Sequence, residues 1–171
     1  MTTSLHDAFL TDHKQLTRGL SAILRALRAG DTERAFRLAS ELDEAVGPHM
    51  QFEEEVFYPE VEKILGREFV DQLYAEHALG QRAIRSILAH GQRGELAGEI
   101  ETLIRDLETT LQHAFSCGTL LSHLDALPAD ETATLLRKLQ ELQGSEIHWS
   151  TLPERRPPSG RHDRANGTGG N

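Results

Sequence analysis

The chain has 171 residues, a formal net charge of −9 and only 5% aromatic residues. This length suits one domain with a sizeable core, and the negative charge argues against nucleic acid or an anionic membrane surface as a partner. The N-terminus lacks the basic and apolar regions of a signal peptide, and no apolar stretch is long enough to cross a bilayer. The single cysteine, Cys117, excludes an intramolecular disulfide. These features predict a soluble, cytoplasmic protein.

An all-α fold is predicted because Leu, Ala, Glu and Arg are abundant and no run of alternating β-branched residues occurs. Turn signals divide the chain into segments whose apolar residues recur at helical spacing. Short turns make consecutive helices antiparallel neighbours, which predicts an antiparallel up-down four-helix bundle with a short fifth helix packed on its outside or end. The expected helices are residues 4–29, 32–64, 67–90, 95–126 and 129–143.

The predicted domain therefore covers residues 1–143, and residues 144–171 are expected to form a disordered tail because the apolar pattern fails from Gly144. Three apolar residues at its start, Ile147, Trp149 and Leu152, are candidates for docking back onto the bundle. No partner is assigned to the tail.

The second predicted helix carries a polar pair on an apolar face. His49 and Glu53 stand one turn apart, about 6 Å along the axis and about 40° apart around it, and they share this face with Phe52. A buried ionised carboxylate is costly unless it is paired, hydrogen-bonded or bound to a metal. Glu54 and Glu55 point away from this face and are interpreted as solvated surface charges.

Counting residues from each turn places one histidine of every long helix in the same layer. His13 and His49 lie 17 and 18 residues from the first turn, and Glu53 and His77 lie 13 and 11 residues from the second. His77 and His113 lie 14 and 19 residues from the third turn, a looser match of about 7 Å. A lone inward histidine is usually a core residue, but four in one layer beside a glutamate indicate a metal site. Imidazole and carboxylate ligands suit iron, with zinc and manganese as alternatives.

With these residues the chain resembles the hemerythrin-like, or HHE cation-binding, family of four-helix bundles with a non-haem di-iron centre. The resemblance covers most of residues 5–126. The most specific part is a His-x-x-x-Glu-Glu-x-x-x-Phe/Tyr-Pro motif from His49 to Pro59. The remaining parts are the pair Asp12-His13, the pair Glu76-His77 and His113, which is followed four residues later by Cys117.

Two departures from the family pattern stand out. The resemblance implies a second bridging carboxylate one turn after His113, where this chain has Cys117, and the invertebrate oxygen carriers have two histidines one turn apart in helix three, where position 81 is Gln. Three interpretations of Cys117 stay open. It is a thiolate metal ligand, or it is a small buried apolar residue beside a site that holds one metal or a weakened pair. In the third, the bundle has lost its metal altogether.

The resemblance implies a protein that holds one or two iron ions and binds or senses a small ligand such as oxygen, nitric oxide or peroxide. The expected ligands are His13, His49, Glu53, His77, His113 and Cys117. The absence of other catalytic motifs favours binding over catalysis. Two alternatives stay open: an enzyme of iron-centre repair, nitric oxide reduction or peroxide removal, and a metal-free helical module that binds other proteins.

Overall fold

The computed structural model describes residues 4–91, 96, 98–124 and 127–155. These residues form helices and connecting turns without any strand, which confirms the all-α prediction. Within this part of the chain, no helix combines the length and apolar character needed to cross a membrane. The elements are α1 (Leu5–Arg28), α2 (Thr32–Phe52), the π-helix η1 (Glu53–Phe57), α3 (Tyr58–Leu65), α4 (Arg67–Gly91), α5 (Ile100–Cys117), the 3₁₀-helix η2 (Gly118–Leu124), α6 (Ala129–Gln143) and the 3₁₀-helix η3 (Trp149–Thr151).

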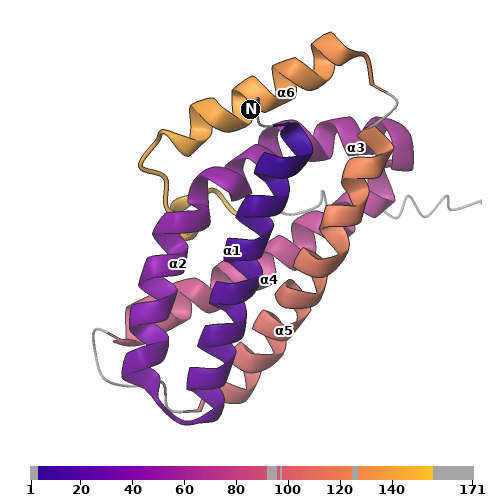
Figure 1. Ribbon diagram of the computed structural model, residues 1–171. Helices are drawn as coiled ribbons and strands as arrows, with labels where there is room; N and C mark the ends of the chain where they lie inside the picture. Colours follow the sequence, from indigo (N-terminus) through magenta and orange to yellow (C-terminus); the bar gives the residue numbers. More distant parts are fainter. Residues whose placement is uncertain (1–3, 92–95, 97, 125–126, 156–171) are drawn as a thin grey trace, which may run out of the picture.

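The long helices pack as a closed group. Helix α1 packs against α2 and α5, and α4 packs against the same two helices, so each has two neighbours in the group (Figure 1). Helix α6 crosses one end of the group and packs against α1 and α2 (Figure 1). Its bounds match the predicted short fifth helix.

Side chains cap the starts of the first two helices. The Ser4 side chain accepts a hydrogen bond from the Asp7 backbone N–H at 3.0 Å, and the Asp31 side chain accepts one from the Arg34 N–H at 3.0 Å. Each cap satisfies a backbone donor that has no partner within its helix.

The second predicted helix is divided by a change of helix type, and its last part, α3, runs in a different direction from α2 (Figure 1). Helix α2 runs through Pro48, and the irregular part is the π-helix η1, where the Tyr58 N–H bonds to the Glu53 carbonyl five residues back. Pro59 has no N–H to offer the preceding turn, so a wider turn before it is a natural response. The helical hydrogen-bond pattern therefore changes between Pro48 and Pro59.

The fourth predicted helix is shorter than expected. Its regular part, α5, ends at Cys117 and continues as the tighter helix η2. The predicted ends at residues 95 and 126 lie outside the described residues.

Two apolar clusters fill the interior. One cluster is at the end of the bundle that α3 and α6 cover, and the other fills the opposite part. The first includes Phe9, Phe52, Phe57, Tyr58, Val61, Val70, Leu121 and Leu139. The second includes Leu20, Ile23, Leu27, Val46, Met50, Ile84, Ile87, Leu107 and Trp149.

Residues 144–155 pack against the bundle, which corrects the disorder expected there and confirms that Ile147, Trp149 and Leu152 dock back onto it. Trp149 is fully buried and Leu152 is 7% exposed. Glycines in α2 and α4 permit this close approach: a Cβ atom at Gly47 would lie 1.9 Å from the Ile147 carbonyl oxygen, and one at Gly80 would lie 2.6 Å from the Trp149 ring. Residues 156–171, the rest of the predicted disordered tail, lie outside the described residues.

Replacing Gly47 with Ala should displace this C-terminal segment, because the new methyl group would meet a backbone carbonyl. We expect the free energy of unfolding to fall by about 1–3 kcal/mol. Trp149 is the only tryptophan, so its fluorescence emission should shift to longer wavelength. Gly19→Ala is the control, since its methyl group would meet only the Leu42 side chain. Unchanged emission in Gly47→Ala would contradict the tight seating of the segment.

Candidate metal centre

A polar layer lies between the two apolar clusters. On each long helix a predicted site residue lies between residues of one cluster and residues of the other, as His13 does between Phe9 and Leu20. All six predicted site residues are buried: His13, His49, Glu53, His77, His113 and Cys117. The structure brings all six together around the Glu53 carboxylate. Counting residues from the third turn had placed His113 about one helical turn away from the level of His77.

One oxygen of Glu53 faces three of the predicted residues. Its Oε1 lies 3.6 Å from His13 Nε2 and 3.6 Å from His49 Nε2. The Cys117 thiol donates a hydrogen bond to the same oxygen over 3.1 Å. Helices α1, α2 and α5 thus place two imidazoles and a sulfur atom around a single carboxylate oxygen.

The other oxygen of Glu53 faces the remaining histidines. Its Oε2 lies 3.1 Å from His77 Nε2, and the His77 and His113 rings pack with their centroids 4.8 Å apart. A residue absent from the sequence-based set joins them: the Tyr58 hydroxyl lies 2.7 Å from His77 Nε2 and 3.1 Å from His113 Nε2. The phenol is fully buried.

Three carboxylates lie behind the histidines, on the nitrogen that faces away from the site. His49 Nδ1 is 3.3 Å from Asp12, His77 Nδ1 is 3.1 Å from Glu54, and His113 Nδ1 is 2.7 Å from Glu76. A fourth acceptor, the Phe9 carbonyl, lies 3.2 Å from His13 Nδ1. The hydrogen bonds of His13, His77 and His113 favour the tautomer with its hydrogen on Nδ1 and Nε2 directed inward, as in known metal sites, whereas Asp12 lies beside His49 Nδ1 without a hydrogen bond.

The prediction that Glu54 is a solvated surface charge is wrong, because Glu54 is 8% exposed and contacts His77. The π-helix η1 explains both this and the omission of Tyr58. In a regular α-helix positions 53 and 58 would lie about 140° apart around the axis, whereas the hydrogen bond from the Tyr58 N–H to the Glu53 carbonyl stacks them. Pro59 is the sequence signal that could have raised this possibility.

Burial and charge act in opposite directions on the ionisable groups. Burial favours neutral His13 and lowers its pKa to about 4 against the attraction of Glu53. Burial would also lower the pKa of His77, but its hydrogen bonds with Glu53 and Glu54 raise it to about 9. Burial and the negative charge of Glu53 together raise the pKa values of Tyr58 and Cys117 well above their usual ranges.

Unpaired nitrogen atoms show that the residues fit a bound cation. His13 Nε2 and His49 Nε2 are buried and have no hydrogen-bond partner among the described residues. Buried polar atoms without partners are costly, and such atoms beside a carboxylate have the chemistry of metal ligands. Two groups have candidate ligand atoms within 4.8 Å of one another: His13, Glu53 and Cys117 form one, and Glu53, His77 and His113 form the other.

A cavity of about 630 Å³ reaches the site between α4 and α5. His113 and Cys117 lie at its inner side, and Ser116 and Gln112, which are exposed, lie on its outer side. The cavity therefore borders both exposed residues and two residues of the polar layer, and its volume exceeds that of a diatomic molecule.

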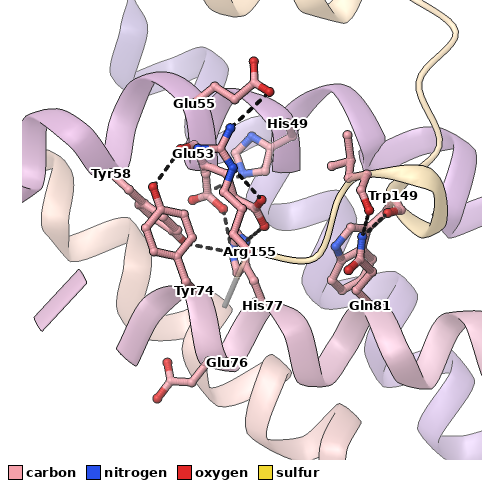
Figure 2. Close-up of polar contacts among 12 residues, drawn as sticks. His49, Glu53, Glu55, Tyr58, Tyr74, Glu76, His77, Gln81, Trp149 and Arg155 are labelled. Carbon is pink, nitrogen blue, oxygen red and sulfur yellow. Dashed lines mark hydrogen bonds and ion pairs between the residues drawn. The ribbon is translucent and has the colours of Figure 1, made fainter. Parts of the chain in front are cut away.

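Gln81, at the position where the oxygen carriers have a further histidine, has another partner. Its side-chain amide donates hydrogen bonds to the Trp149 and Leu152 carbonyls, each over 2.8 Å (Figure 2). The residue therefore holds the C-terminal segment and is not one of the groups around Glu53.

The metal-free protein should be most stable near pH 6.5. Between pH 4 and 6.5 the folded chain holds fewer protons at His13 than the unfolded chain, so stability rises with pH. Between pH 6.5 and 9 the folded chain holds more protons at His77, so stability falls. Denaturant unfolding of the metal-free protein over this range measures the effect. His77→Gln should abolish the decline above pH 6.5, and a wild-type stability that stays level to pH 9 would contradict the assignment.

Comparison with known proteins places the chain in a family. The model of the hemerythrin HHE cation-binding domain matches residues 4–144. The chain matches no curated protein and no solved structure. The family match spans most of the chain and includes every residue around Glu53, and it confirms the resemblance seen in the sequence. The chain belongs to the hemerythrin HHE cation-binding domain family.

Proposed function

We propose that the protein binds two iron ions, one at each oxygen of Glu53, and uses them to bind or sense a small diatomic molecule or oxidant. The observation that carries the proposal is the division of the site: one buried carboxylate has two oxygens, and each faces its own pair of imidazoles. A carboxylate in this position bridges two ions in bundle-core sites.

Two half-sites are defined by this division. The first half-site consists of His13, His49, Cys117 and Glu53 Oε1. The second half-site consists of His77, His113, Tyr58 and Glu53 Oε2. The short helix-to-helix contacts between these residues support the antiparallel bundle that the turn lengths predict.

Cys117 is proposed as a ligand because its sulfur lies beside the same oxygen that His13 and His49 face. Tyr58 is proposed as its counterpart in the second half-site. Thiolate and phenolate are both anionic donors, and together they would supply the negative charge that a second carboxylate provides elsewhere in the family. In the metal-free protein both groups hold their protons, since their pKa values are raised, so metal uptake would release protons.

Bound iron would supply reversible ligand binding and electron exchange, and the chain's own residues would set the conditions for both. The outer carboxylates Glu54 and Glu76 hold the His77 and His113 rings through hydrogen bonds, and Asp12 lies 3.3 Å from His49 Nδ1. Phe9, Phe52 and Phe57 pack near the first half-site and cover its His13 and His49 side with apolar groups. Oxygen, nitric oxide and peroxide all suit such a site, in line with a reducing, cytoplasmic setting for the reduced ions.

Anaerobic loading with ferrous iron tests the proposal through metal content and the optical spectrum after exposure to oxygen. The wild-type chain should take up about two ions. Cys117→Ala and Tyr58→Phe should each lower the affinity for one ion by about tenfold or more, and the double variant should affect both.

Each outcome has a distinct meaning. A wild-type chain that takes up no metal would overturn the metal-binding function. Cys117→Ala protein with unchanged metal content and spectrum would show that the thiol only fills space. The same result for Tyr58→Phe would remove the phenol from the second half-site and leave the rest of the proposal in place.

Blocking the cavity between α4 and α5 should slow the reaction of the reduced, iron-loaded protein with peroxide severalfold. Ser116→Trp places a large side chain at the cavity mouth. Ser122→Trp is the matched control, because Ser122 is also exposed, also bonds a carbonyl of the preceding turn, and does not line the cavity. Stopped-flow absorbance measures both rates. Equal rates in the two variants would show that the ligand enters elsewhere.

A further inference from the structure

The C-terminal segment is firmly seated beside the candidate centre. We name residues 147–155 the strap. Its backbone is held by Gln81, by Arg85, which donates to the Leu152 carbonyl over 2.7 Å, and by Asp43, which accepts from the Ser150 N–H at 2.6 Å. Asp43 is 4% exposed, so this anchor is itself buried. The path of the strap is therefore fixed before it reaches Arg155.

The strap ends over the back of the second half-site. Arg155 Nε lies 3.8 Å from Glu54 Oε2, and Arg155 Nη2 lies 3.3 Å from Glu55 Oε1. Figure 2 shows Arg155 between Glu55 and His77. The other oxygen of Glu54, Oε1, is the atom that lies 3.1 Å from His77 Nδ1. The Glu54 carboxylate thus contacts both Arg155 of the strap and His77, a candidate metal ligand.

Glu54 has few other means of holding its orientation. The Tyr74 hydroxyl donates to the Glu54 backbone carbonyl over 2.8 Å, which fixes the main chain but leaves the carboxylate free to rotate. The carboxylate is nearly buried and lies beside the anionic Glu53, so a positive charge on its outer oxygen stabilises it there. With that oxygen occupied, the inner oxygen stays directed at His77.

We propose that Arg155 is a positioning residue for the second half-site: through Glu54 it fixes the His77 ring with Nδ1–H outward and Nε2 inward. The proposal rests on the proposed metal function and adds that the strap, which comes from the far end of the chain, completes this half-site. Loss of Arg155 would loosen the ring without removing any ligand. Ligand-orienting groups of this kind change metal affinity by about tenfold to a hundredfold, and a group one step further out should change it less.

The test compares Arg155→Gln, Arg155→Lys and Arg82→Gln in the full chain. Arg82 is the matched control, because it is a half-exposed arginine that pairs with the strap residue Glu154 and contacts none of the groups around Glu53. The first measurement is the rate at which ferrous iron passes from the loaded protein to a chelator. Arg155→Gln should release one ion about three to ten times faster than wild type, whereas Arg155→Lys and Arg82→Gln should stay close to it.

A second measurement works without metal. The His77 imidazole N–H signal in NMR spectra of the metal-free protein, assigned with His77→Gln, should shift or exchange faster in Arg155→Gln only. Trp149 fluorescence should stay unchanged, which shows that the strap is still docked. Equal iron release and an unchanged His77 signal in Arg155→Gln and Arg82→Gln would overturn the proposal. A wild-type chain that takes up no iron would overturn the proposed function instead, and the NMR comparison would still decide the role of Arg155.

Discussion

The structure depends on the buried carboxylate of Glu53. It has no exposed surface, and its neighbours come from every long helix of the bundle. Burial would raise the pKa of this carboxyl, but the imidazoles of His49, His77 and His13 hold it well below its usual range. An anion at the centre of a domain is costly unless it is compensated. The four helices are thus held in one register by a charge that none of them compensates alone.

The irregular helix around Glu53 lets a short stretch of chain supply so many of the polar groups. Glu53, Glu54 and Tyr58 all point toward the polar layer, which a regular α-helix would prevent because these positions would spread around its circumference. The π-helix η1 gathers them, and such turns are frequently found at functional sites. The same turn accommodates Pro59, so one local irregularity serves both the backbone and the site.

Prediction from sequence succeeded where regular geometry applies. Helical spacing predicted the all-α fold, and residue counts from the turns placed His13, His49 and His77 in one layer, because regular helices rise by a constant amount per residue. It failed for Tyr58 and Glu54, since a π-turn changes which residues share a face. For the strap it identified the docking residues Ile147, Trp149 and Leu152 but still expected a disordered tail, because the side-chain bonds from distant Asp43 and Gln81 leave no local pattern.

Gln81 connects these departures from the family pattern. The resemblance associates this position with a further imidazole, yet the amide holds the Trp149 and Leu152 carbonyls, bonds that an imidazole with a single N–H could not reproduce. The glutamine that holds the strap therefore leaves position 81 of α4 without an imidazole. In the second half-site the Tyr58 phenol lies beside His77 instead. The strap contacts this half-site indirectly, because Arg155 pairs with Glu54 and Glu54 contacts His77. One side chain, Gln81, thus accounts both for the absence of an imidazole at this position and for the anchoring of the C-terminal segment.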